Sequence, residues 1–295
     1  MKSLSLESLY PSSDGYIIIE PLATTGGKTC TANNLYSASF QALMAIRFNK
    51  SLSFAKYSTD EMGCGDDRLD GTFHHFFDFN KLDIVDSPQE YPKGFGSAAQ
   101  ILIKSSNLAD ILDLKADDSQ NLDFRICPHE FFQEPIAAKY IRSNLDKIFH
   151  KELLESNEDG IFVHYRLGDI ANLAAINVEH FESAIASVPN YENLPKYISS
   201  DSPRDDRVSR ICDNYGFVLH ESSPQETIKF GSRFTNKLLS YGTFSWFIGV
   251  LGSQNNIIFP NSNDYIRWHG DIFVFNDWHE FDRTTRQISF SWKTR

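Results

Sequence analysis

Residues 161–169 have the composition of a ligand-binding turn: an apolar run that ends in His-Tyr-Arg-Leu-Gly-Asp. Because successive residues of a strand point to opposite faces, His164 and Arg166 are expected to project together. The planar guanidinium of Arg166 matches two oxygens of a phosphate, and Gly168 permits a bend at which a ligand can approach backbone N–H groups. Asp169 is placed to hold Arg166 or the loop. The pattern predicts an anion-binding corner; the alternative is a buried Arg–Asp pair that only closes the turn.

The composition limits the class of protein. The chain has 295 residues, 41% of them hydrophobic, and a formal net charge of −11. This charge counts against a nucleic-acid partner, and it requires an anionic ligand to be held by a local cationic pocket. The four cysteines are widely spaced and suggest neither a zinc site nor a disulfide framework, so a reducing, cytoplasmic location is expected. No apolar run approaches the roughly 20 residues of a membrane span, so we expect a soluble protein and leave open its association with a membrane surface.

The first half of the chain opens with a β-α-β pattern. Residues 16–21 and 52–55 are predicted strands, and apolar spacing predicts a helix over residues 34–48. Farther on, one helix is expected near residues 98–104, and Pro135 begins an amphipathic helix. Such an alternation builds a parallel sheet.

The second half alternates strands and helices more regularly. Predicted strands cover residues 161–165, 196–200, 217–220 and 256–259, and predicted helices cover residues 178–188, 204–215, 225–239 and 244–251. A polar turn at residues 155–160 separates the halves. The sequence therefore predicts an α/β protein with two lobes, residues 1–155 and 156–295. Ligands of such sheets bind beyond the carboxyl ends of the strands, and both the Arg166 turn and Asp201 follow predicted strands.

Several segments together resemble the α-1,2-fucosyltransferases and the wider fucosyltransferase-like group of GT-B type, which implies two facing Rossmann-like lobes. Residues 164–169 are similar to the family pattern His-x-Arg-Arg-Gly-Asp, and Phe-Gln-Glu at 132–134 is similar to a Phe-Gln-Ser/Glu that precedes a helix. Gly-Thr-Phe-Ser-Trp-Phe at 242–247 resembles the family's Ser-Ser-Phe-Ser-Trp-Trp, and a strand ending in proline follows at 257–260. The order and intervals agree over the second half of the chain.

The resemblance implies a donor site in the second lobe. There the arginine of the motif binds the diphosphate of a nucleotide sugar, and a hydroxyl-rich turn begins a helix whose N–H groups meet the same phosphates. Carried over by position, the donor-binding residues are His164, Arg166, Gly168, Asp201, Thr243, Phe244 and Ser245. Arg166 and Asp169 are the residues expected to act in catalysis.

Two departures bear on the substrates. Leu167 stands where the family has a second arginine, so a charge from Arg204 or Arg233 is a candidate replacement. The loop at residues 26–28 matches the family's glycine-rich loop less well, which leaves the placement of the acceptor open. GDP-fucose is the favoured donor, and transfer of xylose, rhamnose or galactose on the same fold is the alternative.

The proton acceptor is not fixed by the pattern. Asp66, Asp67, Asp70 and His74 in the first lobe are the candidate bases, and spacing singles out none of them. An acidic pair such as Asp66-Asp67 holds a divalent cation in other glycosyltransferases, but a solvated turn is favoured here and no metal is expected. The rival hypotheses are a non-catalytic nucleotide- or sugar-binding module and a metal-dependent hydrolase that uses the acidic cluster.

The function expected from these observations is metal-independent, inverting glycosyl transfer. A nucleotide sugar binds the second lobe, a glycan acceptor binds the first, and the growing charge on the leaving diphosphate is stabilised by Arg166 and the helix start. No cofactor besides the nucleotide-sugar co-substrate is implied, and the oligomeric state is left open.

Overall fold

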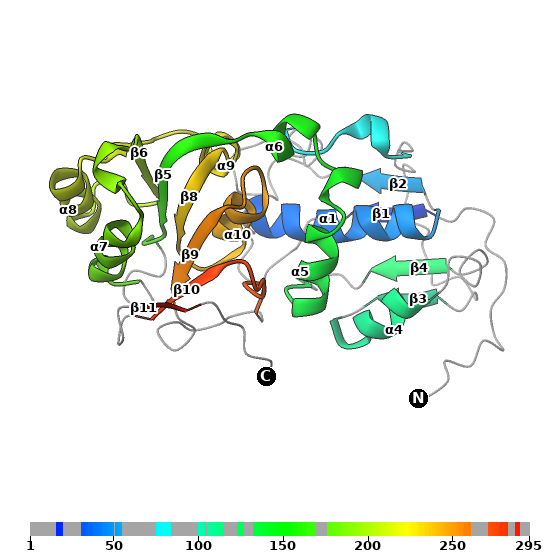
Figure 1. The fold of residues 1–295 in the computed structure, drawn as a ribbon. Helices are drawn as coiled ribbons and strands as arrows, with labels where there is room; N and C mark the ends of the chain where they lie inside the picture. Colours follow the sequence, from blue (N-terminus) through cyan, green and yellow to red (C-terminus); the bar gives the residue numbers. More distant parts are fainter. Residues whose placement is uncertain are drawn as a thin grey trace. The chain divides into compact units, whose positions relative to one another are not determined.

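A computed structural model of the chain describes residues 16–19, 31–49, 51–54, 75–83, 100–103, 105–114, 123–126, 132–168, 176–260, 271–282 and 287–289. The chain divides into two compact units, Met1–Phe149 and His150–Arg295 (Figure 1). This division falls six residues before the boundary at 155/156 that the polar turn suggests, because the short helix α6 (Lys151–Glu155) belongs to the second unit.

The described residues of the first unit hold two pairs of parallel strands. Strands β1 (Tyr16–Ile19) and β2 (Ser51–Phe54) are joined by helix α1 (Thr31–Arg47), and β3 (Gln100–Ile103) pairs with β4 (Asp123–Ile126). Helix α4 (Leu108–Asp113) and helix α5 (Pro135–Arg142) follow the strands of the second pair. Short 3₁₀ helices cover Phe79–Lys81, Ser105–Asn107 and Leu145–Lys147.

Helix α1 forms the core of the first unit because apolar side chains repeat along it at helical spacing. Leu35, Phe40 and Leu43 are buried. Phe40 stacks on Phe132 with ring centroids 5.0 Å apart, which fixes the segment that precedes α5. Pro135 stands in the first turn of α5, as expected for a residue that lacks an N–H.

The helix expected near residues 98–104 is wrong, because this segment forms strand β3. Its apolar part is Ile101-Leu102-Ile103, a run too short for periodicity to distinguish a strand from a helix. β-branched residues at both ends of the run favour the strand.

The described part of the second unit contains a seven-stranded sheet in the order β11-β10-β9-β8-β5-β6-β7. All neighbours pair in parallel except β10 and β11. The strands are β5 (Glu158–Tyr165), β6 (Lys196–Ser200), β7 (Val218–Leu219), β8 (Phe234–Leu239), β9 (Asn256–Pro260), β10 (His279–Asp282) and β11 (Gln287–Ser289). Numbered along the chain, the six parallel strands run 3-2-1-4-5-6, the order of a Rossmann fold. The predicted α/β class is confirmed.

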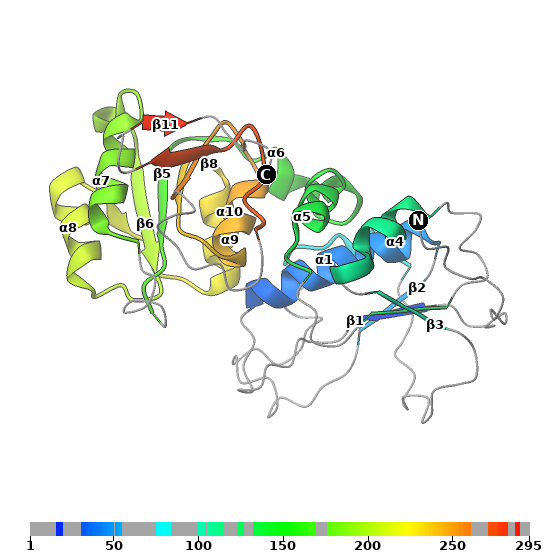
Figure 2. The same ribbon diagram turned by 90° about the horizontal axis from the view of Figure 1, so that it is seen from below.

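Helices cover both faces of this sheet. Helices α7 (Val178–Ser187) and α8 (Asp206–Tyr215) lie on one face, and α9 (Pro224–Ser232) and α10 (Thr243–Val250) lie on the other (Figure 2). A 3₁₀ turn, Tyr191–Asn193, follows α7. Alternate side chains of β5 point to opposite faces of the sheet. Val163 and Tyr165 join the apolar cluster with α7 and α8, whereas Phe162 packs on the ring of Phe230 from α9.

The single helix expected over residues 225–239 is also wrong. Helix α9 ends at Ser232, and the following residues form β8, which pairs with β5 at the centre of the sheet. Gly231 and Ser232 stand at the end of α9 but were not interpreted as a helix end, and Lys237 gives the following strand a polar residue. Lys237 is nevertheless fully buried, and its Nζ donates a hydrogen bond of 2.7 Å to the carbonyl of Leu251.

Candidate functional site

The carboxyl ends of β5 and β8 meet where the strand order of the sheet reverses. The chain continues from β5 toward β6 on one side and from β8 toward β9 on the other. Loops that leave such a switch point in opposite directions open a crevice between them, where ligands of α/β proteins bind. In this crevice the N–H of Arg166 donates to Ser240 Oγ at 2.9 Å, and the N–H of Ser240 donates to the carbonyl of His164 at 3.0 Å.

The Arg166 side chain lies against the start of helix α10. Gly242, the residue before this helix, has a φ of 104°, a conformation that favours glycine. A Cβ added there would lie 2.9 Å from Nη1 of Arg166, so the absence of a side chain at 242 makes room for the guanidinium. As a glycine, Gly242 also leaves the first turn of α10 without a side-chain cap. A fixed positive charge and the N-terminus of a helix therefore share one corner, which suits an anion.

His164 is neutral in this corner. Burial, and then the nearby charge of Arg166, lowers the pKa of its imidazole from 6.5 to about 3. Its Nδ1 is hydrogen-bonded to Ser245 Oγ at 2.6 Å, and its ring stacks on Phe244 with centroids 4.7 Å apart. His164 and Arg166 do project together, but only Arg166 brings positive charge. The imidazole connects β5 to the first turn of α10 and so fixes the helix start beside the arginine.

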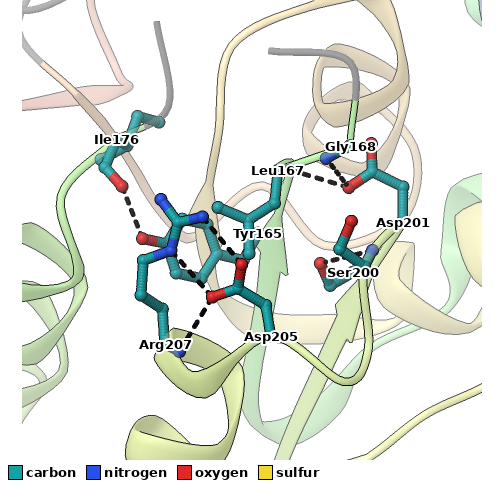
Figure 3. Close-up of polar contacts among 9 residues, drawn as sticks. Tyr165, Leu167, Gly168, Ile176, Ser200, Asp201, Asp205 and Arg207 are labelled. Carbon is teal, nitrogen blue, oxygen red and sulfur yellow. Dashed lines mark hydrogen bonds and ion pairs between the residues drawn. The ribbon is translucent and has the colours of Figure 1, made fainter. Parts of the chain in front are cut away.

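Asp201 lies at the end of β6 and contacts the backbone of the turn after β5. Its Oδ1 accepts the N–H of Leu167 at 2.7 Å and the N–H of Gly168 at 2.9 Å (Figure 3). A Cβ added at Gly168 would lie 2.5 Å from Asp201 Oδ2. The turn and the loop after β6 are thus packed so closely that a side chain at position 168 would collide with the Asp201 carboxylate.

A second carboxylate in the loop after β6, that of Asp205, has a structural role. Asp205 accepts the N–H of Arg207 at the start of α8 and pairs with its guanidinium at 2.8 Å. The hydrogen bond to the Arg207 side chain lowers the pKa of Asp205 to about 2. Nearby, the hydroxyl of buried Tyr165 donates to the carbonyl of Ile176 at 2.5 Å (Figure 3). These contacts hold the segment before α7 and the loop after β6 in place.

Leu167 faces the hydrophobic core. Its side chain is fully buried in the same cluster as Val163 and Tyr165, on the face of the sheet opposite Arg166. The position at which the resembled family has a second arginine is therefore not a phosphate contact here. Of the proposed replacements, Arg233 pairs with Glu158 at the amino end of β5, whereas the crevice lies at the carboxyl ends of the strands. Arg204 is exposed in the loop after β6.

Several expected site residues lie outside the described part of the chain. These are Asp169 and the candidate bases Asp66, Asp67, Asp70 and His74. The described residues contain no group of three or more His, Cys, Asp or Glu that could hold a metal ion. Within the same residues, no helix is long and apolar enough to cross a membrane.

Sequence reasoning missed Ser240 and Gly242 as site residues. Both follow β8, which the sequence presented as the end of a helix, so neither was placed at the edge of the sheet. The usable signal was the small residues Ser240 and Gly242 directly before the hydroxyl-rich helix start at Thr243. The other predicted members His164, Arg166, Phe244 and Ser245 come together as described above.

The fold and the site define a class: an α/β protein with a Rossmann-type unit in which an arginine and the start of a helix meet at the switch point. No known protein-family model and no curated protein matches the sequence. Solved fucosyltransferase structures are similar to it at low levels. The α-1,6-fucosyltransferase NodZ soaked with GDP-fucose gives a TM-score of 0.48 at 11% identity, over 81% of this chain and 93% of NodZ.

Two further structures give similar values. Fucosyltransferase NodZ from Bradyrhizobium has a TM-score of 0.45 at 12% identity, over 80% of this chain and 93% of its own. A variant of FUT1 from Arabidopsis thaliana in complex with GDP has a TM-score of 0.42 at 12% identity, over 82% of this chain and 69% of FUT1. Because these similarities are low, the fold assignment rests on the strand order of the sheet.

Proposed function

We propose that the protein is a glycosyltransferase that moves a sugar from a nucleoside diphosphate donor to a glycan hydroxyl, with GDP-fucose as the favoured donor. One observation carries the proposal. The guanidinium of Arg166 lies against Gly242, at the uncapped start of α10, inside the switch-point crevice. A planar donor fork beside the N-terminus of a helix fits the two phosphates of such a donor.

The same arrangement assists the bond-breaking step. When the bond between the sugar and the diphosphate breaks, negative charge grows on the leaving phosphate. Arg166 and the first N–H groups of α10 are fixed where they can stabilise that charge, and preorganised donors of this kind are a large source of catalysis. The neutral imidazole of His164 keeps the helix start in place through Ser245.

The donor sugar and the remaining roles follow the resemblance. Because Leu167 lies in the core, its difference from the family's arginine does not count against GDP-fucose. We assign donor binding to the second lobe and acceptor binding to the first, with Asp169 supporting Arg166. One of Asp66, Asp67, Asp70 and His74 would take the proton from the acceptor hydroxyl. Arg166 and the helix dipole take the place of a metal ion, so transfer is proposed to need none.

The test is release of nucleoside diphosphate from a panel of nucleotide sugars by the purified full chain, with chelator present. We expect GDP-fucose to be turned over, by slow hydrolysis or by transfer to added glycan, and Arg166→Ala to lower the rate about 100-fold or more. Arg233→Ala, which removes an arginine at the opposite edge of the sheet, is the matched control and should leave the rate unchanged. Binding without turnover would identify a non-catalytic module. Activity that returns only with manganese or magnesium would refute metal independence.

A further inference from the structure

In the described part of the turn after β5, residues 166–168, the three consecutive backbone N–H groups all have acceptors. The N–H of Arg166 bonds to Ser240 Oγ at 2.9 Å, and those of Leu167 and Gly168 bond to Asp201 Oδ1 at 2.7 and 2.9 Å. Ser240 follows β8 and Asp201 follows β6, the two strands that flank β5. The turn is therefore held from both sides, and its N–H groups are not available to bind a phosphate.

From this geometry we infer that Asp201 is a positioning residue: it holds the turn that aims Arg166 at the diphosphate and makes no contact with the nucleotide itself. The inference rests on the proposed function, because it presupposes an anion at Arg166. It replaces the nucleotide contact that the family resemblance suggests for Asp201 and gives Gly168 a structural reason in place of a ligand contact.

Charge supports the assignment. A carboxylate close to a diphosphate would repel it unless its own charge were engaged, and two N–H donors on one oxygen engage it with charge-assisted hydrogen bonds. Among the described residues, the side chain of Asp201 has no other hydrogen-bond partner. The Asp201 carboxylate thus holds the backbone of the turn that carries Arg166.

Packing at Gly168 supports it independently. An added Cβ would lie 2.5 Å from Oδ2 and 2.9 Å from Cγ of Asp201. The side chain of an aspartate is short, so the carboxylate cannot move away without losing its bonds to the turn. Gly168→Ala is therefore expected to have the same effect as removal of the Asp201 carboxylate.

The test is calorimetric titration with inorganic pyrophosphate and with GDP. Because pyrophosphate has no nucleoside, a positioning role predicts that Asp201→Ala weakens both ligands by the same factor, about tenfold. Asp201→Asn keeps an oxygen acceptor for both N–H groups and should restore binding to within about threefold of the parent protein. Gly168→Ala should match Asp201→Ala, and the double variant should be no weaker than either one. Each variant is first shown to melt cooperatively.

The outcomes separate the inference from the proposed function. If Asp201→Ala weakens GDP but leaves pyrophosphate unchanged, Asp201 contacts the nucleoside and the inference is overturned. It is also overturned if Asp201→Asn binds as poorly as Asp201→Ala, since the charge and not the acceptor would then matter. If the parent protein binds neither ligand, the proposed function itself fails.

Discussion

At the scale of single residues, the neutral state of His164 has a measurable consequence for stability. The folded pKa of about 3 lies below the ordinary value of 6.5, so the unfolded chain binds an extra proton between these pH values. The free energy of unfolding therefore falls as the pH drops below 6.5, by up to about 1.4 kcal/mol per pH unit from this residue. We expect His164→Asn to lose less stability over this range than the parent protein. Urea denaturation at a series of pH values measures the difference, and parallel curves below pH 6.5 would show that His164 binds its proton in the folded state as readily as in the unfolded chain.

Leu167 gives a second prediction at this scale. Because its side chain lies in the apolar cluster of the sheet, Leu167→Arg would bury a charge without a partner and should lower the free energy of unfolding by about 3 kcal/mol or more. Leu167→Met keeps an apolar side chain of similar volume and should cost less than about 1.5 kcal/mol. Chemical denaturation of both variants is the measurement. Equal stabilities would mean that position 167 faces the crevice, where a second arginine would meet phosphate.

Arg166 and Leu167, which are neighbours in the sequence, show what a motif can and cannot predict. Alignment with the family pattern places both 166 and 167 at the phosphates. In the structure Arg166 lies against the start of α10, whereas Leu167 lies in the core. The strand alternation in the same segment puts Leu167 on the face of Val163 and Tyr165, away from Arg166, and this simpler pattern is the correct one for position 167. The pKa of His164 could not be predicted, because it depends on burial by residues of α10 that are distant in sequence.

At the scale of elements, the junction between β8 and α10 carries the site. Gly242→Ala would place a Cβ 2.9 Å from Arg166 Nη1 and would strain the backbone at a φ of 104°. We expect a stability loss of about 1–3 kcal/mol and a GDP affinity lowered about tenfold. Gly216→Ala is the matched control, because Gly216 also has a positive φ, of 70°, but an added Cβ there meets only Lys196 Cε, at 3.9 Å.

Calorimetry with GDP and thermal melting of both glycine variants separate strain from site geometry. The control should lose stability and keep its affinity for GDP. If both variants bind GDP equally well, the space at Gly242 is not what keeps Arg166 in place. If both bind it equally poorly, backbone strain alone explains the loss.

The elements show where sequence patterns stop being informative. Strands β5, β6 and β9 and the helices α7, α8 and α10 were predicted close to their observed bounds, because each has a clear apolar period and turn residues at its ends. Strand β8 was not predicted, although it lies at the centre of the sheet. Its buried Lys237 is tolerated because Nζ donates a hydrogen bond to the carbonyl of Leu251, the residue after α10, a tertiary contact that no local pattern reveals.

At the scale of the whole molecule, the strand order explains how distant segments make one site. Arg166 follows the first strand of the parallel sheet, Asp201 follows the second, and Ser240 and Gly242 follow the fourth. Their loops meet only because the order 3-2-1-4-5-6 brings the first and fourth strands together. The site is also a local cationic feature on a chain with a net charge of −11, so its affinity for an anion depends on Arg166 and the helix start and not on the overall field.

The central claim, that this corner binds a nucleoside diphosphate through Arg166, is tested most directly by calorimetric titration of GDP in chelator. The parent protein should bind, and Arg166→Ala should bind about 10- to 100-fold more weakly, because it loses charge-assisted hydrogen bonds to phosphate. Arg233→Ala should bind like the parent protein. An Arg166→Ala variant that stays folded and keeps the parent affinity would contradict the account.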